Sequence, residues 1–473
     1  MLFNSLEYLF FLPSIFFLYW FIFHRNLKIQ NLLILISSYV FYGWWDWRFL
    51  SLIFISTVVD YFVGLKISNS QDNSIRKSYL WVSILFNLGL LCFFKYFDFF
   101  IDSWIDLLSS FGYEQKSVWA LNVILPVGIS FYTFQTMSYS LDIYYKKLKP
   151  TKDFISFASF VSFFPQLVAG PIERASNLLP QMLSNRVFRY KNGVQGLRLI
   201  LWGMFKKVVI ADSLGLRVDY IFDNYMVCNG GTLLLGLIYF SFQIYCDFSG
   251  YSDIAIGTAK LFGIELSSNF KFPYFSRNIG EFWKRWHISL SSWFKDYLYI
   301  PLGGSKKGNW VAIRNIFIIF IISGFWHGAN WNFIIWGFSH ALLYVPLFVL
   351  GKKYNYTSNI VAKNKIIPSI KEAMQMGFTF LIVTISWVFF RSESIIDSIN
   401  YLYIIFSNFA LPFYKAEFGF IIILLVFDWT MRSDERNVLQ YKSRFVRYLI
   451  YLIFPFLIIW FNSIKKTFIY FQF

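Results

Sequence analysis

Long apolar segments recur along the whole chain and limit its possible folds more than any other feature. A helix needs about 20 apolar residues to cross a bilayer, whereas a membrane β-barrel would alternate apolar and polar residues in stretches of about ten. We therefore expect an all-α, polytopic membrane protein with about ten to twelve crossings, because some segments are short or polar enough to be re-entrant. The apolar segments lie near residues 6–24, 29–43, 49–65, 79–97, 118–145, 154–170, 194–211, 231–248, 310–326, 331–350, 374–390, 401–429 and 445–462.

The composition supports this class of protein. Hydrophobic residues make up 57% of the 473 residues and charged residues only 15%, whereas a soluble domain carries roughly a quarter charged residues. The deficit of charge extends along the whole chain, and neither a repeat of fixed period nor a Pro/Ser/Gly-rich linker divides it. We therefore predict a single integral-membrane domain over residues 1–473.

The excess of basic residues fits a membrane protein as well. Lys and Arg number 43 against 26 Asp and Glu, a formal net charge of +17, which in a soluble protein would raise the possibility of nucleic-acid binding. Here the basic residues cluster in short loops between apolar segments, as the positive-inside rule predicts, and such loops attract anionic lipid headgroups. We expect membrane lipids, and no nucleic acid, among the partners.

The loop charges also predict an orientation. Loops 25–30, 66–78 and 146–153 are basic, whereas loop 98–114 is acidic. Basic loops stay in the cytoplasm, so the three basic loops are predicted to be cytoplasmic and the acidic loop to lie outside. The N-terminus then lies outside, and residues 1–20, which have neither a basic leader nor a small-residue cleavage site, are predicted to be a first transmembrane helix instead of a cleaved signal peptide.

Polar residues in the middle third interrupt the apolar pattern. Two prolines and a glycine within residues 163–174 predict that a helix ends or kinks there, in a re-entrant or interfacial elbow. Farther along, Asp247 and Asp253 follow an apolar run. These carboxylates could act as acid and base, but we favour the alternative that they cap a helix or hydrogen-bond a neighbouring turn.

An aromatic stripe predicts an amphipathic helix over residues 279–300. At about 100° per residue, the apolar side chains fall within one stripe, and Lys284 and Lys295 lie nearly opposite. This pattern is typical of a helix at the membrane interface, and His287 beside the stripe could face the protein interior. The stripe consists of Phe282, Trp286, Leu290, Trp293 and Tyr297.

The four histidines differ in their expected roles. His24 adjoins Arg25 at a helix end, where contact with water or a lipid headgroup is expected. We expect His340 to form hydrogen bonds between helices. His327 is the strongest candidate for chemistry, because it lies in the polar segment 323–331 between two apolar segments, and ionisable groups at membrane depth are costly and usually functional.

Two interpretations of His327 remain open on the residues alone. It is either a buried imidazole satisfied by a neighbouring carbonyl, or a base, because a neutral imidazole with a reference pKa of about 6.5 can take a proton from a hydroxyl at neutral pH. Gly324 and Gly328 would allow a helix or a ligand to approach closely, and Trp326 and Trp331 would form rigid walls.

Several common functional motifs are absent from the sequence. There is no GxSxG elbow, phosphate-binding loop or HExxH pair, which argues against the usual hydrolases, ATPases and metalloproteases. The three cysteines, Cys92, Cys228 and Cys246, show neither CxxC nor metal-ligand spacing, so we expect no disulfide framework or zinc site.

Three segments together resemble the membrane-bound O-acyltransferase family, in particular its bacterial alginate O-acetylase branch. They are LVAGPI at 167–172, FWKRWHISLSSWF at 282–294 and SGFWHGANW at 323–331. The resemblance begins with LFNS at 2–5 and implies a multi-helix fold in which re-entrant and interfacial helices surround a central funnel. The catalytic core is expected at about residues 120–345.

The resemblance also implies a reaction and its residues. The family moves an acyl group from a cytoplasmic thioester donor to an acceptor hydroxyl, and this branch implies acetyl-CoA as the donor, with no tightly bound cofactor and no metal. His327 is implied as the catalytic histidine and His287 as a second active-site residue. His327 would deprotonate the hydroxyl, and His287 or Asn330 would stabilise the oxyanion.

Contacts to the substrate and the donor are expected around these histidines. Basic side chains could bind the phosphates of the acyl carrier or, equally well, interfacial lipid. The residues predicted for these contacts are Lys284, Arg285, Trp293, Trp326 and Asn330, with Lys306 and Lys307 as further phosphate contacts.

The implied function is transfer of an acetyl group across a bacterial cytoplasmic (inner) membrane to an envelope polysaccharide, with a separate extracytoplasmic acetyltransferase or esterase-like partner. D-alanyl transfer in teichoic-acid modification is the alternative within the family. A polysaccharide or lipid transporter is the alternative outside the enzymes, in which the buried histidines would form a relay. Inverted repeats would support a transporter, and none is evident in the sequence.

Overall fold

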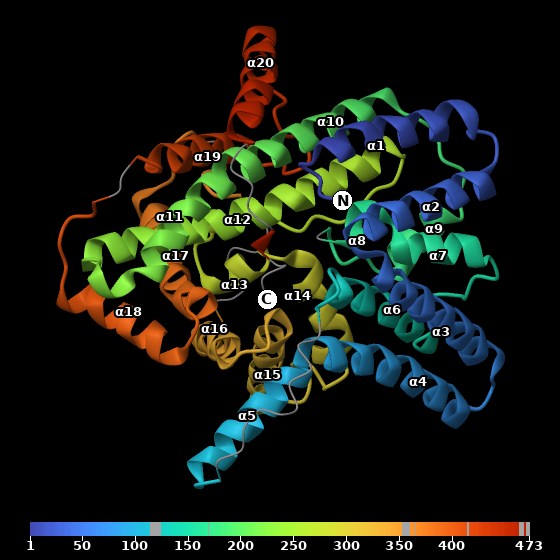
Figure 1. Ribbon diagram of the computed structural model, residues 1–473, viewed down its shortest axis with the longest axis horizontal. Coiled ribbons are helices and arrows are strands. Elements are labelled where there is room, and N and C mark those ends of the chain that lie inside the picture. The colour runs from blue at the N-terminus through green and yellow to red at the C-terminus, as the bar shows by residue number, and fades with distance from the viewer. Residues whose placement is uncertain are drawn as a thin grey trace. The chain divides into compact units, whose positions relative to one another are not determined.

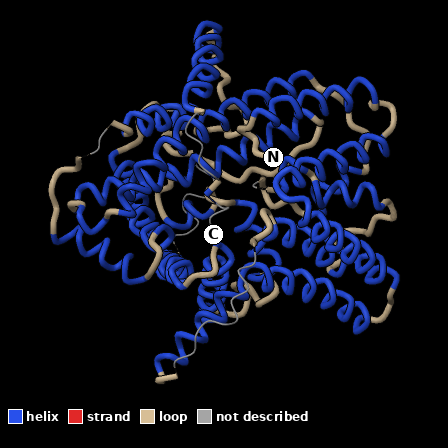
Figure 2. The backbone as a smooth tube through the Cα atoms, in the orientation of Figure 1, coloured by secondary structure: helices blue, strands red, loops and turns tan. Residues whose placement is uncertain are grey.

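The computed structural model describes two compact units built from helices. The first unit comprises Met1–Gly193 with Thr258–Leu266, and the second comprises Val194–Gly257 with Ser267–Phe473. Within the described residues the chain forms helices and loops without a strand, which confirms the all-α prediction (Figure 2). The described residues are 1–113, 124–168, 170–351, 360–363, 365–413, 416–462 and 468–469.

Seven helical stretches in this described part are long and apolar enough to cross a membrane. They establish a multi-pass membrane protein, while the ten to twelve crossings remain a prediction. The predicted segment 118–145 begins outside the described residues. The acidic segment 98–114, predicted to be a loop, is instead helical as far as Ser110, and its last residue lies outside the described residues. The seven stretches are Leu27–Asn69, Asn73–Ser110, Gly230–Leu261, Asn309–His327, Trp331–Val349, Ile370–Arg391 and Arg444–Phe461; shorter apolar helices cover Leu6–Ile22, Phe154–Leu167, Ile395–Ser407 and Phe418–Met431.

The first unit contains the N-terminal helices (Figure 1). Its helices are α1 (Leu6–Phe17), α2 (Leu27–Asp46), α3 (Leu50–Asn69), α4 (Asn73–Leu91), α5 (Phe97–Ser110), α6 (Ile129–Tyr144), α7 (Phe154–Ser162), α8 (Phe164–Leu167) and α9 (Ala175–Met182). The helix break predicted within residues 163–174 is confirmed, because α7 ends at Ser162 and α8 has only 4 residues.

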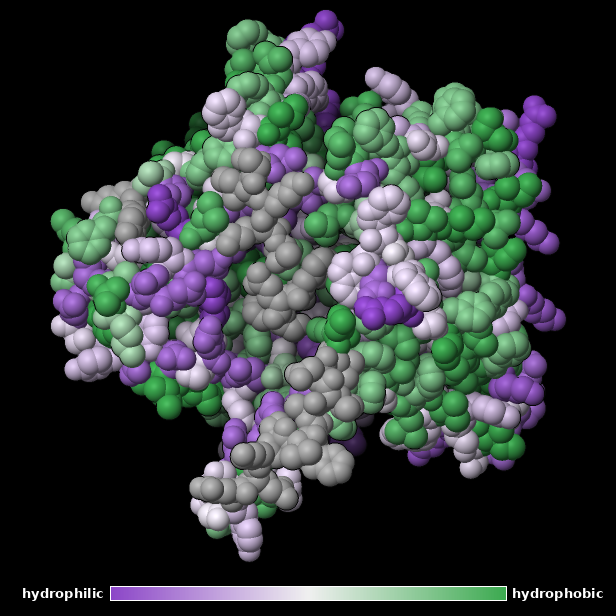
Figure 3. Space-filling view, in the orientation of Figure 1, coloured by the Kyte–Doolittle hydropathy of each residue, from purple (hydrophilic) through white to green (hydrophobic). Residues whose placement is uncertain are grey.

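The first unit has an apolar exterior and a polar cluster inside. Hydrophobic residues cover much of its visible face, as expected for helices in lipid (Figure 3). Inside, Asp60 of α3 is fully buried and accepts hydrogen bonds from Ser140 Oγ of α6 at 2.8 Å, from Asn87 Nδ2 of α4 at 2.7 Å, and from the Ser83 hydroxyl of α4. Polar side chains within a bundle join its helices in this way.

The second unit contains every candidate for chemistry except His24. Its helices are α10 (Tyr190–Met204), α11 (Asp212–Asp223), α12 (Gly230–Leu261), α13 (Ile279–Trp283), α14 (Ile288–Phe294), α15 (Asn309–His327), α16 (Trp331–Val349), α17 (Ile370–Arg391), α18 (Ile395–Ser407), α19 (Phe418–Met431) and α20 (Arg444–Phe461). The first residues of α10 and the last residues of α12 belong to the first unit.

Helices α15 and α16 form a tight hairpin through two glycines. A Cβ atom added at Gly324 would lie 2.1 Å from the carbonyl oxygen of Phe333, and one added at Gly337 would lie 2.1 Å from that of Phe320. The predicted close approach at Gly324 is therefore confirmed, and the approaching element is another helix. This hairpin fixes the end of α15, where His327 lies.

A buried ion network replaces the helix caps predicted for Asp247 and Asp253. Both residues lie inside α12, so neither caps a helix, but Asp247 does accept a hydrogen bond from the backbone N–H of Ile469, at 2.7 Å. Lys207 Nζ lies 2.6 Å from Asp247 and 2.8 Å from Asp212, and Lys206 Nζ lies 2.8 Å from Asp253. Buried charges of opposite sign offset part of each other's desolvation, which explains two adjacent lysines in the apolar segment 194–211.

The single amphipathic helix predicted over residues 279–300 is also wrong. The structure has α13, then a break, then α14 and a π-helical turn, Lys295–Tyr299. At the break, the carbonyl of Arg285 accepts from Lys271 N–H, and Ile288 N–H donates to the Asn269 carbonyl, both at 2.9 Å. Backbone groups that a continuous helix would pair internally are thus paired with a distant segment.

Candidate active site

His287 and His327 lie next to each other in the second unit. Both imidazoles are buried, and their ring centroids are 6.3 Å apart. His327 is the last residue of α15, and His287 directly precedes α14. The indole of Trp326 contacts both rings, at 5.9 Å from His287 and 5.0 Å from His327. The structure therefore brings together three of the predicted site residues.

Aromatic side chains from later helices surround His327. The ring of Trp336 lies 5.2 Å from the imidazole and that of Phe390 lies 5.3 Å from it, both edge-on. Trp331, which we expected to form a wall, is instead 54% exposed at the start of α16. No local sequence motif marks Trp336 and Phe390, because α16 and α17 carry them to the site.

The break between α13 and α14 holds His287 in an unusual backbone conformation. Its φ of 43° and ψ of 53° are left-handed, which costs a residue other than glycine about 1–3 kcal/mol unless its surroundings impose it. The imidazole Nδ1 lies 3.1 Å from Asn269 Oδ1, and the ring packs edge-on against Phe248 at 4.7 Å. His287 lies outside the seven candidate spans, and burial lowers its pKa to about 3. The imidazole is therefore neutral at physiological pH.

His340 joins three helices, as expected from the sequence. It lies on α16, and its Nδ1 accepts a hydrogen bond from Trp283 Nε1 of α13 at 3.3 Å. Its Nε2 is hydrogen-bonded to Ser386 Oγ of α17 at 3.0 Å. The predicted interhelical hydrogen bonding is confirmed, whereas the role of the exposed His24 remains a prediction.

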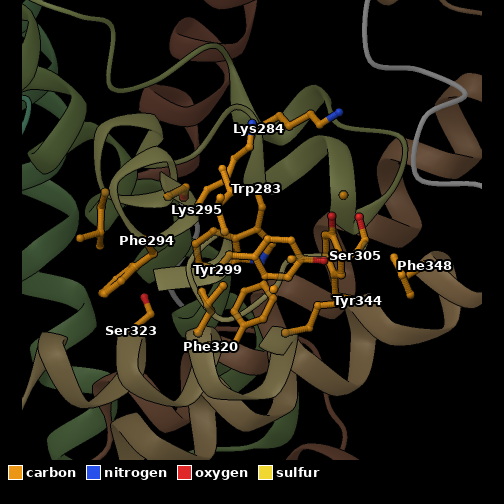
Figure 4. A pocket seen from close by; sticks show the side chains of 18 of the residues that line it. Trp283, Lys284, Phe294, Lys295, Tyr299, Ser305, Phe320, Ser323, Tyr344 and Phe348 are labelled. Atoms are coloured by element: carbon orange, nitrogen blue, oxygen red, sulfur yellow. The ribbon is translucent and has the colours of Figure 1, made fainter. Parts of the chain in front are cut away.

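A cavity of about 730 Å³ lies between α13, α14, α15 and α16. Part of its wall is aromatic, with Trp283, Phe320 and Tyr344 close together, and Lys284 extends away from them (Figure 4). Ser323 also lines the cavity and lies one helical turn before His327 on α15, so the two residues share a face of that helix. The lysines that line the cavity are Lys284, Lys295, Lys306 and Lys307.

The other residues predicted for substrate or donor contacts lie outside the lining of this cavity. Arg285 Nη2 pairs with Glu281 at 2.5 Å, and Trp293 packs against Tyr297 with ring centroids 5.0 Å apart. Asn330 caps α16 by accepting from Asn332 N–H at 2.9 Å, and it donates to the Glu393 carbonyl at 3.2 Å. Their predicted roles remain predictions.

The candidate site also contains no evident metal-ligand cluster. In the part of the chain that the structure describes, no group of three or more His, Cys, Asp or Glu residues could hold a metal ion. The three cysteines are free thiols, with Cys92 exposed and Cys228 and Cys246 buried. The absence of a resident metal or cofactor remains a prediction.

The geometry defines a class of protein: a multi-pass membrane protein with a buried histidine pair and a basic cavity. Neither histidine lines the cavity, but its lining includes Ser323, one helical turn before His327. Comparison with known families identifies that class further. The match to MBOAT, the membrane-bound O-acyltransferase family, covers residues 49–348. The chain belongs to this family, and it is an O-acyltransferase; the resemblance noted in its motifs is confirmed.

Individual relatives agree with this assignment. A probable alginate O-acetylase of Pseudomonas putida is 39% identical over 397 residues, which cover 84% of this chain and 78% of that protein. A peptidoglycan O-acetyltransferase of Helicobacter pylori is 36% identical over 431 residues, covering 85% and 79%. A teichoic acid D-alanyltransferase of Bacillus subtilis is 30% identical over 260 residues, covering 52% and 63%.

Proposed function

We propose that this O-acyltransferase moves an acetyl group from cytoplasmic acetyl-CoA to a hydroxyl of a cell-envelope polysaccharide or of an extracytoplasmic partner. The observation that carries the proposal is the cavity, which is lined by four lysines and reaches Ser323, one turn from His327. The similarity to an alginate O-acetylase and a peptidoglycan O-acetyltransferase supports an acetyl group and a polysaccharide. The transporter alternative lacks comparable support.

The cavity suits an acyl carrier that is charged at one end. Lysine ammonium groups bind phosphate oxygens through charge-assisted hydrogen bonds, and Lys306 and Lys307 are exposed enough to meet a soluble donor. The aromatic wall around Trp283 would hold the uncharged arm that carries the thioester. The acetyl group would then lie toward Ser323 and His327.

His327 acts as the base in the proposed reaction. As the imidazole takes the hydroxyl proton, the hydroxyl oxygen attacks the thioester carbonyl carbon. The C–S bond then breaks, and the imidazolium returns the proton to the leaving thiolate. No net charge develops on the protein over the cycle, which suits a buried site because isolated charges are costly there.

The location of the reaction follows from its two substrates. A cytoplasmic donor and an envelope acceptor require an enzyme in the cytoplasmic (inner) membrane. We place the catalytic core at about residues 120–345, a span that contains both histidines and every residue lining the cavity except Phe348. A separate extracytoplasmic acetyltransferase or esterase-like protein would pass the acetyl group to the final sugar.

Replacement of His327 tests the proposed base. In cells that carry His327→Ala, acetyl ester on the envelope polysaccharide should fall at least about 100-fold, the usual loss when a general base is removed. The matched control is His24→Ala, an exposed histidine whose loss should leave acetylation intact. The amount of membrane-inserted protein is measured in parallel, and undiminished acetyl ester with His327→Ala would contradict the proposal.

The lysines test the identity of the donor. With purified enzyme and acetyl-CoA, the double variant Lys306→Ala/Lys307→Ala should raise KM for the donor about tenfold or more while kcat changes little, because the lost contacts are to the carrier. Lys442→Ala, an exposed lysine outside the cavity, is the control. A wild-type enzyme that uses a D-alanyl carrier protein and ignores acetyl-CoA would establish the D-alanylation alternative.

A further inference from the structure

Asn269, which no sequence motif marks, is hydrogen-bonded to His287. It is 1% exposed, and its Oδ1 lies 3.1 Å from His287 Nδ1. Its Nδ2 donates to Ser252 Oγ of α12 at 3.1 Å, so the amide is anchored on both sides. The backbone of Asn269 also accepts from Ile288 N–H at 2.9 Å. Asn269 and His287 are thus held together through their side chains and through the main chain.

The contacts of Asn269 determine which atom of its amide faces His287. The same Oδ1 lies 3.4 Å from the backbone N–H of Ser289 and 2.9 Å from Ser289 Oγ. A backbone N–H can only donate, so the amide atom that faces it must be the accepting oxygen and not the NH₂ group. Rotating the amide by 180° would set two donors against each other.

An accepting oxygen opposite Nδ1 fixes the proton of the imidazole. A neutral imidazole carries one proton, and the nitrogen that bonds to a pure acceptor must be the one that carries it. We propose that Asn269 is a positioning residue that holds His287 as the Nδ1-protonated tautomer, so that His287 Nε2 accepts a hydrogen bond in the acyl-transfer site and donates none.

This assignment, which rests on the proposed function, changes the role of His287. Stabilising an oxyanion requires a donor, and Nε2 of this tautomer carries a lone pair, so the oxyanion contact implied for His287 is not available. The ring centroids of His287 and His327 are 6.3 Å apart, so their nitrogens are at least about 4 Å apart, too far for a direct hydrogen bond. The proton of the reacting hydroxyl goes to His327, so any group that hydrogen-bonds to His287 Nε2 must do so as a donor.

The charged groups around His287 leave this assignment intact. The imidazole of His327 is the titratable group that faces it from α15. On α12, the carboxylates that adjoin Phe248 and Ser252 in the sequence are Asp247 and Asp253, and each is paired with a lysine. Arg285, two residues before His287, is paired with a glutamate. These pairs are Asp247 with Lys207, Asp253 with Lys206, and Arg285 with Glu281.

Nitrogen NMR of the intact protein measures the tautomer directly. With ¹⁵N-labelled histidine there are four imidazoles to resolve, and His287→Gln identifies the signal of His287. We expect a protonated Nδ1 and an unprotonated Nε2 in the wild type, in Asn269→Asp and in the control Ser252→Ala, whereas Asn269→Ala should lose the preference for Nδ1. A wild-type Nε2–H tautomer would overturn the proposal, and this holds even if Asn269→Ala does not fold.

A pH profile separates positioning from simple packing. The carboxylate in Asn269→Asp would favour the imidazolium and raise the pKa of His287. The acid limb of the acetyl-transfer profile should therefore move to higher pH than in the wild type, while a merely structural change would lower the rate equally at every pH. An unchanged profile shape overturns the proposal. Absence of acetyl transfer in the wild type would instead count against the proposed function, and the NMR result would still decide the tautomer.

Discussion

His287 links the stability of the protein to pH at the scale of a single residue. Its pKa is about 3 in the folded state and about 6.5 in an unfolded chain. Between these values the unfolded state binds more protons, so the free energy of unfolding falls as pH falls, by up to about 1.4 kcal/mol per pH unit. The stabilising difference is fully present above the unfolded pKa and is lost progressively below it.

Thermal unfolding in detergent tests this linkage. The unfolding midpoint should fall between about pH 7 and about pH 4, and His287→Gln should flatten part of that slope because glutamine does not titrate. His24→Gln, which replaces an exposed histidine, should keep the wild-type slope. If His287→Gln and the wild type share one slope, His287 is not the group responsible.

At this scale the sequence predicts residues that carry a local signature and misses those placed by distant segments. The SGFWHGANW motif identifies His327 and the FWKRWH motif identifies His287, and the two residues lie together in the structure. Asn269 stands in an unremarkable stretch, SSNF. The left-handed backbone of His287, and two backbone hydrogen bonds that join residues 269–271 to Arg285 and Ile288, bring the Asn269 side chain to the imidazole.

At the scale of elements, the α15–α16 hairpin determines where His327 lies. Gly324→Ala would place a methyl group against the backbone of α16, where a Cβ atom would be 2.1 Å from the Phe333 oxygen. Backbone cannot rotate away as a side chain can, so the helices must separate. We expect the free energy of unfolding to fall by about 2 kcal/mol or more, and acetyl transfer to fall because His327 shifts against Trp336.

A second glycine supplies the control for this substitution. Gly377 lies inside α17, and a Cβ atom added there would meet no atom within 4 Å. Gly377→Ala should leave acetyl transfer unchanged and stabilise the helix by up to about 1 kcal/mol. Measuring unfolding and activity for both variants separates close helix packing from a general effect of replacing glycine. Equal behaviour of the two variants would disprove the role of the hairpin.

The length of the apolar segments predicts that they are helical, but it does not predict where a helix is interrupted. The aromatic stripe over residues 279–300 has the period of one helix, yet the helix is interrupted between α13 and α14. The reason is non-local, because Arg285 and Ile288 pair with residues 269–271. Periodicity reports which side chains are buried, and the stripe residues are indeed buried; it does not report which backbone groups find partners elsewhere.

At the scale of the whole molecule, the apolar segments predict a polytopic helical protein correctly, while orientation remains a prediction. The proposed function adds a requirement to the charge pattern. If the cavity receives a cytoplasmic thioester, the loop that carries Ser305, Lys306 and Lys307 must face the cytoplasm. The positive-inside rule favours the same side for this loop. The proposed function and the basic charge of the loop therefore both predict that it faces the cytoplasm.

Cysteine labelling tests this orientation in intact cells. In a background without native cysteines, Ser305→Cys, at an exposed residue of the cavity lining, should resist a membrane-impermeant maleimide until the cells are permeabilised. Asp106→Cys, at an exposed residue of α5 within the acidic segment predicted to lie outside, should react at once. Acetyl-CoA should slow the labelling of Ser305→Cys after permeabilisation, because the donor would occupy the cavity. Labelling of Ser305→Cys in unpermeabilised cells would place the cavity mouth outside and exclude a cytoplasmic donor at that site.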